Sequence, residues 1–136
     1  MSRRRLGWLG LIMVGAMGGT SLRNLLEAAW PAAPGAWPWT TFWINLAGSF
    51  VLGALLESLS ASPLSEAWQR GLRLGLGTGL LGGFTTYSTF ATETAVLGTS
   101  GAVAVSFGYA LASVASGVLL AAAGMLVTRR LLGGRR

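Results

Sequence analysis

The side chains that most enzymes use for catalysis are nearly absent from this sequence. Its 136 residues contain no His, Cys, Lys or Asp, and its only acids are Glu27, Glu57, Glu66 and Glu93. Without Cys there is no thiolate nucleophile, and without His the commonest acid–base side chain and metal ligand is missing. The polar groups that remain are hydroxyls, amides, arginines and the backbone. They favour ion or solute binding and predict that the protein is not an enzyme.

An amide and several hydroxyls repeat at helical spacing. Thr41, Asn45 and Ser49 recur every four residues, so they share one face of a helix. Asn45 lies deep in an apolar stretch, where a polar side chain indicates either function or an interhelical hydrogen bond. A second stripe of hydroxyls, consistent with either packing or a polar track, comprises Ser106, Tyr109, Ser113 and Ser116.

The string Gly82-Gly83-Phe84-Thr85-Thr86-Tyr87-Ser88-Thr89-Phe90 is poor material for an unbroken helix, because glycine and hydroxyl residues disfavour helix interiors. It overlaps the end of a stripe of glycines, suited to close helix packing, at Gly71, Gly75, Gly79 and Gly83. We expect a break at Gly82–Thr85. Broken helices within membranes commonly build ion sites, with carbonyls for cations and N–H groups for anions. Tyr87 and Phe90 then share a face, either for packing or to line a path.

Two charged residues lie at the borders of apolar stretches and each has two readings. Arg23 either anchors a helix end at the membrane interface or attracts anions toward a pore mouth. Glu93 is either an interfacial anchor or a pore-mouth residue.

The elements that position these residues are predicted from the gaps between charges. The chain is 52% hydrophobic and 10% charged, whereas soluble domains are about 25% charged. Its uncharged runs predict an all-α membrane protein with one domain, 1–136, and four transmembrane helices. The last run is divided at Gly98–Gly101, where glycine and small polar residues favour a turn. The predicted spans are about 6–27, 37–57, 72–97 and 102–128.

The arginines predict the orientation of these spans. With four crossings, both termini and the 58–71 loop share one side, and Arg23 alone lies near the other. This bias predicts a multi-pass protein of the inner (plasma) membrane with both termini in the cytoplasm. An alternative is that the N-terminal arginines begin a signal peptide. The nine arginines on the predicted cytoplasmic side are Arg3, Arg4, Arg5, Arg70, Arg73, Arg129, Arg130, Arg135 and Arg136.

The polar groups together predict a passive path for an anion. No ring of carboxylates is available to hold cations, whereas hydroxyls, an amide, backbone N–H groups and Arg23 are donors. Aromatic ring edges carry partial positive charge and add to this set.

The sequence resembles the Fluc (CrcB) fluoride channel family over nearly its whole length. The strings that carry the resemblance are Gly18-Gly19-Thr20-Ser21-Leu22-Arg23, Asn45-Leu46-Ala47-Gly48-Ser49-Phe50, and Gly82 to Phe90 followed by Glu93. The resemblance implies an antiparallel, dual-topology dimer of four-helix subunits with two pores that passively export cytoplasmic fluoride. It also implies a central structural Na⁺ held by the backbone carbonyls of Gly82 and Thr85.

The resemblance further implies a fluoride pathway. Asn45 is its pore asparagine, the edges of Tyr87 and Phe90 line it, and Arg23 sits at a vestibule. The polar residues assigned to the rest of the pathway are Thr41, Ser88, Thr89, Tyr109, Ser113 and Ser116.

Two features depart from the family pattern. Tyr87 stands where the family usually has Phe, and its hydroxyl either bonds fluoride or obstructs it. The arginine bias favours one orientation, whereas a dual-topology homodimer requires two. A homodimer is therefore the first expectation, and a heterodimer with an inverted paralogue, in which this chain is a non-conducting half, is the second.

Two other classes of protein have a similar size. A small dual-topology drug exporter requires a glutamate embedded in the first span, but Glu27 lies at the end of that span. An assembly subunit without transport would use Asn45 and the hydroxyl stripes only as contacts between helices.

Overall fold

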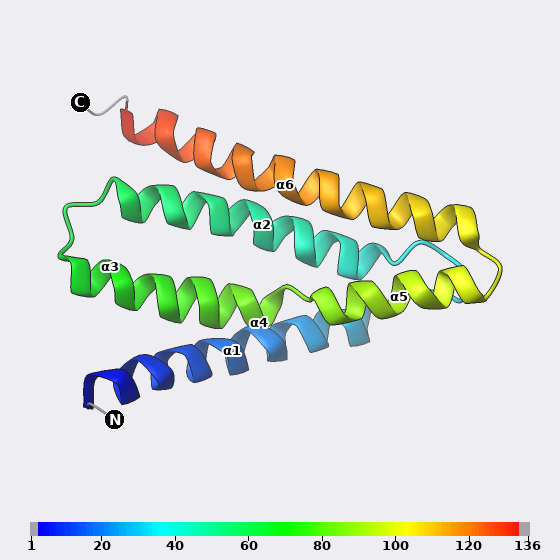
Figure 1. The fold of residues 1–136 in the computed structure, drawn as a ribbon, viewed down its shortest axis with the longest axis horizontal. Helices are drawn as coiled ribbons and strands as arrows, with labels where there is room; N and C mark the ends of the chain where they lie inside the picture. Colours follow the sequence, from blue (N-terminus) through cyan, green and yellow to red (C-terminus); the bar gives the residue numbers. More distant parts are fainter. Residues whose placement is uncertain (1–2, 134–136) are drawn as a thin grey trace.

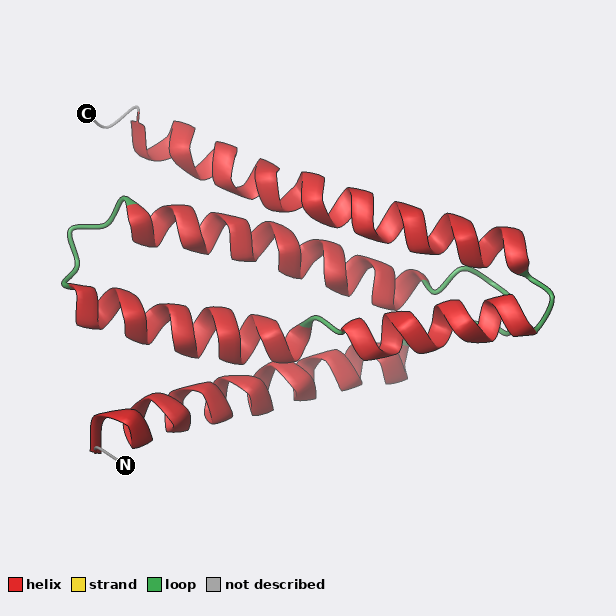
Figure 2. Cartoon of the chain, viewed as in Figure 1, coloured by secondary structure: helices red, strands yellow, loops and turns green. Residues whose placement is uncertain are grey.

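A computed structural model describes residues 3–133, and every regular element within that range is helical (Figures 1 and 2). Arg135 and Arg136, which contribute to the predicted charge bias, lie outside the described residues. The elements in chain order are α1 (Arg3–Ala29), α2 (Trp39–Ser60), α3 (Glu66–Leu72), the π-helix η1 (Arg73–Leu81), α4 (Gly82–Phe84), α5 (Tyr87–Thr99) and α6 (Val103–Gly133).

Three of the described helices are long and apolar enough to cross a bilayer, at 5–29, 39–60 and 103–133. Their apolar side chains point outward: Val14 is 71% exposed, Met17 69% and Leu119 69%. Such a surface suits a hydrocarbon environment. The all-helical membrane class is therefore confirmed. The segment predicted as the third span is divided among α3, η1, α4 and α5, and its crossing of the membrane remains a prediction.

The helices lie side by side and bring both termini to one end of the bundle (Figure 1). α2 packs along α6, α1 packs against η1 and α4, and α5 packs against α6. The loop between α2 and α3 lies at the same end as the termini (Figure 1). At the opposite end α5 stops at Thr99, where a turn was predicted, and Gly101 adopts a φ of 90° before α6.

Glycines let α1 approach η1 and α4 at backbone distance. A Cβ on Gly79 would lie 2.8 Å from the carbonyl oxygen of Ile12, and one on Gly83 would lie 2.6 Å from that of Ala16. A Cβ on Gly15 would collide with the carbonyl of Gly75. The predicted glycine stripe is thus a surface for close helix packing.

The predicted helix break is present, but it lies later than expected. Thr85 and Thr86 are extended, with φ/ψ of −74°/156° and −144°/119°. Gly82 and Gly83 were predicted to lie within the break, yet they form α4. The absence of a Cβ at Gly83 lets the backbone of α1 pack directly against α4. Gly83 is therefore needed for this helix contact and not for backbone flexibility.

The π-helix η1 was not predicted. Its wider turn is visible at its end, where the N–H of Gly82 bonds the carbonyl of Gly77, five residues earlier. Such turns are rare and often occur at functional sites. Here only the short α4 separates η1 from the break.

Candidate functional site

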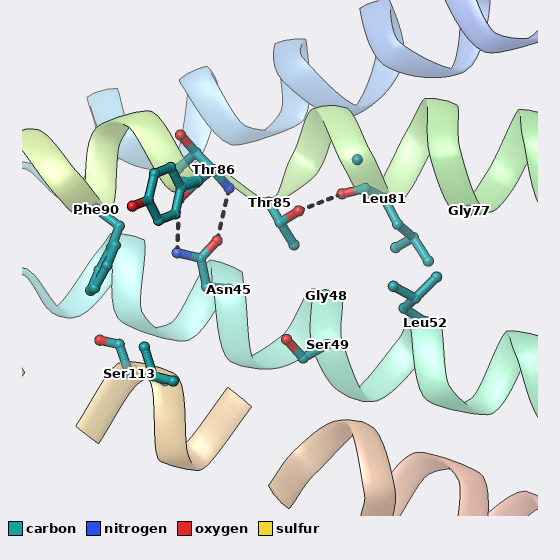
Figure 3. Close-up of a pocket in the computed structure, with 13 residues that line it drawn as sticks. Asn45, Gly48, Ser49, Leu52, Gly77, Leu81, Thr85, Thr86, Phe90 and Ser113 are labelled. Atoms are coloured by element: carbon teal, nitrogen blue, oxygen red, sulfur yellow. Dashed lines mark hydrogen bonds between the residues drawn. The ribbon is translucent and has the colours of Figure 1, made fainter. Parts of the chain in front are cut away.

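Asn45 holds the helix break open. Its Nδ2 donates to the carbonyl oxygen of Thr86 at 3.1 Å, and the N–H of Thr86 donates to its Oδ1 at 2.8 Å (Figure 3). The amide thus replaces the bond that the Thr86 N–H would donate in a helix, and it adds a second donor to the Thr86 carbonyl, which as the N-cap carbonyl also begins α5. Thr86 is 7% exposed, so its N–H would otherwise be buried without a partner.

Thr86 also caps the start of α5. Its Oγ1 accepts from the N–H of Thr89 at 3.1 Å, as N-cap threonines do. The same hydroxyl lies 3.2 Å from the Oγ of Ser88 and donates to the Oγ1 of Thr89 at 3.0 Å. The hydroxyls of Ser88 and Thr89, both assigned to the pathway from the sequence, therefore belong to this cap.

The break releases two backbone carbonyls. In a continuous helix the N–H of Thr86 would bond the carbonyl of Gly82, but it bonds Asn45 instead. The carbonyl of Thr85 likewise loses the N–H of Thr89, which bonds the Oγ1 of Thr86. The released oxygens belong to the two residues expected to hold Na⁺. Carbonyl oxygens are ligands that hard cations prefer, so this donor set fits such an ion.

The carbonyl of Gly83, between these two, is satisfied by α1. Thr20 Oγ1 donates to it at 3.3 Å and Arg23 Nε at 3.4 Å. Arg23 also pairs with Glu27 at 3.1 Å. Arg23 thus caps the end of α4 in addition to either role considered from the sequence. Thr20 was not predicted to be a site residue. Its position one helical turn before Arg23, on the same face of α1, could have indicated that the two side chains share a partner.

A cavity of about 320 Å³ lies beside the break (Figure 3). Its walls are mainly apolar, and neither a carboxylate nor a basic side chain is among the described residues that line it. Ser113 is 8% exposed, and its Oγ has no hydrogen-bond partner within residues 3–133. Buried hydroxyls are normally paired, so this one is available to a ligand or water. The lining residues are Asn45, Gly48, Ser49, Leu52, Gly77, Leu81, Gly82, Thr85, Thr86, Tyr87, Phe90, Ser113 and Val114.

Three aromatic rings form a series of contacts, two of them in the cavity wall and the third beyond it. The ring centroids of Tyr87 and Phe90 are 6.0 Å apart, and those of Phe90 and Tyr109 are 5.4 Å apart. Tyr87 is 81% exposed in the single chain, whereas Tyr109 is fully buried.

Tyr109 and Thr41 meet at Glu93, outside the cavity lining. The Tyr109 hydroxyl donates to Glu93 Oε2 at 2.7 Å, and Thr41 Oγ1 donates to Oε1 at 2.7 Å. Three helices thus converge on one carboxylate, which is neither at an exposed helix end nor in the cavity wall.

The remaining stripe residues play different parts. Ser106 Oγ donates to the carbonyl of Thr94 at 2.7 Å, which is a packing contact between α5 and α6. Ser116 is half-buried and does not line the cavity. Ser49 does line it, although the sequence showed only that it shares a face with Asn45.

The chain resembles known sequences over most of its length. The family described as CrcB-like protein, Camphor Resistance (CrcB), matches residues 10–125. "Fluoride-specific ion channel FluC 1" of Cutibacterium acnes is 42% identical over 97% of this chain and 92% of its own length. "Fluoride-specific ion channel FluC" of Chelativorans sp. is 41% identical over 91% and 98%. "Fluoride-specific ion channel FluC 2" of Leifsonia xyli is 45% identical over 85% and 79%.

Proposed function

This chain belongs to the CrcB family of integral membrane channel proteins and is not an enzyme, and from that premise we propose that it is a passive, fluoride-selective channel that exports cytoplasmic fluoride. The observation that carries the proposal is the pair of hydrogen bonds between Asn45 and Thr86. These bonds keep the helix open beside a cavity whose buried Ser113 hydroxyl is unpaired within the described residues.

The donors around this cavity suit a small anion. The Asn45 amide, the Ser113 hydroxyl and the ring edges of Tyr87 and Phe90 are neutral groups with positive character. Fluoride would pass from the cavity along Phe90 toward Tyr109. The Arg23 side chain is also assigned to this route. The remaining hydroxyl residues assigned to it are Thr41, Ser88, Thr89 and Ser116.

We assign the released carbonyls of Gly82 and Thr85 to a structural Na⁺. A second, antiparallel copy would bring its own pair to the same place, which gives four oxygen ligands near a two-fold axis. When bound, the ion would supply a fixed positive charge. Asn45 and Thr86 contribute by keeping both carbonyls out of helical hydrogen bonds.

The assembly follows from the same arrangement. Each subunit would cross the plasma membrane four times, with α3, η1, α4 and α5 as one interrupted crossing, and the dimer would have two pores. The arginines at the end that carries both termini favour a cytoplasmic location for that end. The same bias supports a second candidate, a heterodimer with an inverted paralogue.

Efflux from liposomes that contain only this chain tests the proposal. We expect rapid fluoride release with little chloride release, read with ion-selective electrodes. Chloride release as fast as fluoride release would overturn the proposed selectivity. If folded protein releases neither ion, Tyr87→Phe in the same assay separates two causes. Recovery of flux identifies obstruction by the phenol, and continued silence contradicts a channel formed by this chain alone.

Phe90→Ile is expected to lower fluoride efflux at least tenfold while the protein stays folded. Isoleucine retains most of the apolar volume but lacks the ring edge that faces the cavity. Phe107→Ile is the matched control, because Phe107 is 69% exposed on α6 and does not line the cavity. Equal flux from both variants would contradict the role of the Phe90 ring.

A further inference from the structure

An apolar groove of about 400 Å³ lies between α1 and the α3–η1 segment. Two tryptophans frame it: Trp8 is half-buried over Gly71, and Trp68 is 68% exposed. Gly75 lines the groove, and a Cβ there would make an ordinary van der Waals contact, 3.8 Å from Leu11 Cβ. The lining residues are Trp8, Leu11, Ala67, Trp68, Gly71, Leu72, Gly75 and Leu76.

This groove is separate from the cavity at the helix break. The two share no lining residue, and η1 turns Gly75 and Leu76 toward the groove but Gly77 and Leu81 toward the cavity.

Positive charge beside this groove distinguishes it from a second apolar groove formed by the described residues. Arg5 is exposed one helical turn before Trp8, and the exposed Arg70 and Arg73 are next in the chain to the lining residues Gly71 and Leu72. That second groove, about 450 Å³ between α1 and α2, is also framed by tryptophans. No arginine is among the described residues that line either groove, so the difference lies in the arginines beside them. The nearby Arg23 is paired with Glu27.

We propose that the Trp8–Trp68 groove binds an anionic phospholipid. One acyl chain occupies the groove, and Arg5 binds the phosphate of the head group. Tryptophans at the interface and arginines beside them suit the boundary between hydrocarbon and head groups. The proposal rests on insertion in a membrane and is independent of conduction.

Native mass spectrometry of the purified chain tests this site, with phosphatidylglycerol and phosphatidylcholine of identical acyl chains added in equal amounts. We expect phosphatidylglycerol to be retained preferentially. Arg5→Gln should weaken that retention about fivefold, because each basic residue near an anionic lipid contributes roughly that much. Gly75→Leu should abolish it by filling the groove. Two control variants should leave the retention of phosphatidylglycerol unchanged. Arg130→Gln removes an arginine of α6, and Ala47→Leu fills the second groove.

Several results would overturn the proposal. Equal retention of the two lipids would indicate nonspecific lipid at the surface. Retention that survives Gly75→Leu would indicate that the acyl chain lies elsewhere. Displacement by millimolar inorganic phosphate would indicate a site for free phosphate. If Gly75→Leu changes only the ratio of monomer to dimer, the groove is an interface between copies of this chain.

Discussion

Asn45→Leu is expected to reduce fluoride efflux at least tenfold in the liposome assay. Leucine is similar in size but makes neither bond to Thr86, whose N–H would then be buried without a partner. Each such group costs about 1–3 kcal/mol, which is enough to favour another conformation of the break. The released carbonyls and the cavity would both change with it.

Two variants separate this effect from a general loss of polarity. Asn24→Leu, at the chain's other asparagine, lies on the exposed surface of α1 and should conduct normally. Asn45→Asp retains an acceptor for the Thr86 N–H, so it should fold better than Asn45→Leu but still conduct poorly because its charge repels fluoride. Normal flux in Asn45→Leu would show that the amide is only a contact between helices.

Gly83→Ala is expected to destabilise the protein by about 1–3 kcal/mol and to abolish flux, because overpacked sites respond on this scale. The added Cβ would lie 2.6 Å from the carbonyl oxygen of Ala16 and 3.0 Å from its Cα. These are backbone atoms that cannot move aside as a side chain can. The helices would separate, and Thr20 and Arg23 would lose the Gly83 carbonyl.

Thermal unfolding of the detergent-purified protein measures this effect. Gly75→Ala is the control, since its nearest contact would be 3.8 Å from Leu11 Cβ. We expect a clear fall in Tm for Gly83→Ala and little change for Gly75→Ala. Similar Tm values for both variants would show that α1 does not pack against α4 as closely as described.

The sequence predicted the helical membrane class because charge gaps and apolar runs are local properties. It also predicted an interruption after the glycine stripe. The position of that interruption was wrong because Gly82 and Gly83 were interpreted through helix propensity alone. Gly83 packs against α1, and its contact with Thr20 joins residues more than 60 positions apart in the chain. Local propensity does not register this packing, which holds Gly83 within α4.

The roles of the polar residues depended even more on tertiary structure. Helical spacing placed Thr41, Asn45 and Ser49 on one face, but it did not show that each meets a different group. Asn45 bonds the backbone of Thr86, Thr41 bonds Glu93, and Ser49 lines the cavity. The π-helix could not be predicted either, because a single wider turn leaves little trace in the amino-acid composition.

The reversal potential of purified protein in a planar bilayer tests the central claim most directly. With a fluoride gradient and equal chloride on both sides, a fluoride-selective path predicts a reversal potential that changes by about 59 mV per tenfold gradient. Adding a chloride gradient should not change that value. A reversal potential that follows chloride, or that stays near zero as the fluoride gradient is varied, would contradict a fluoride-selective channel.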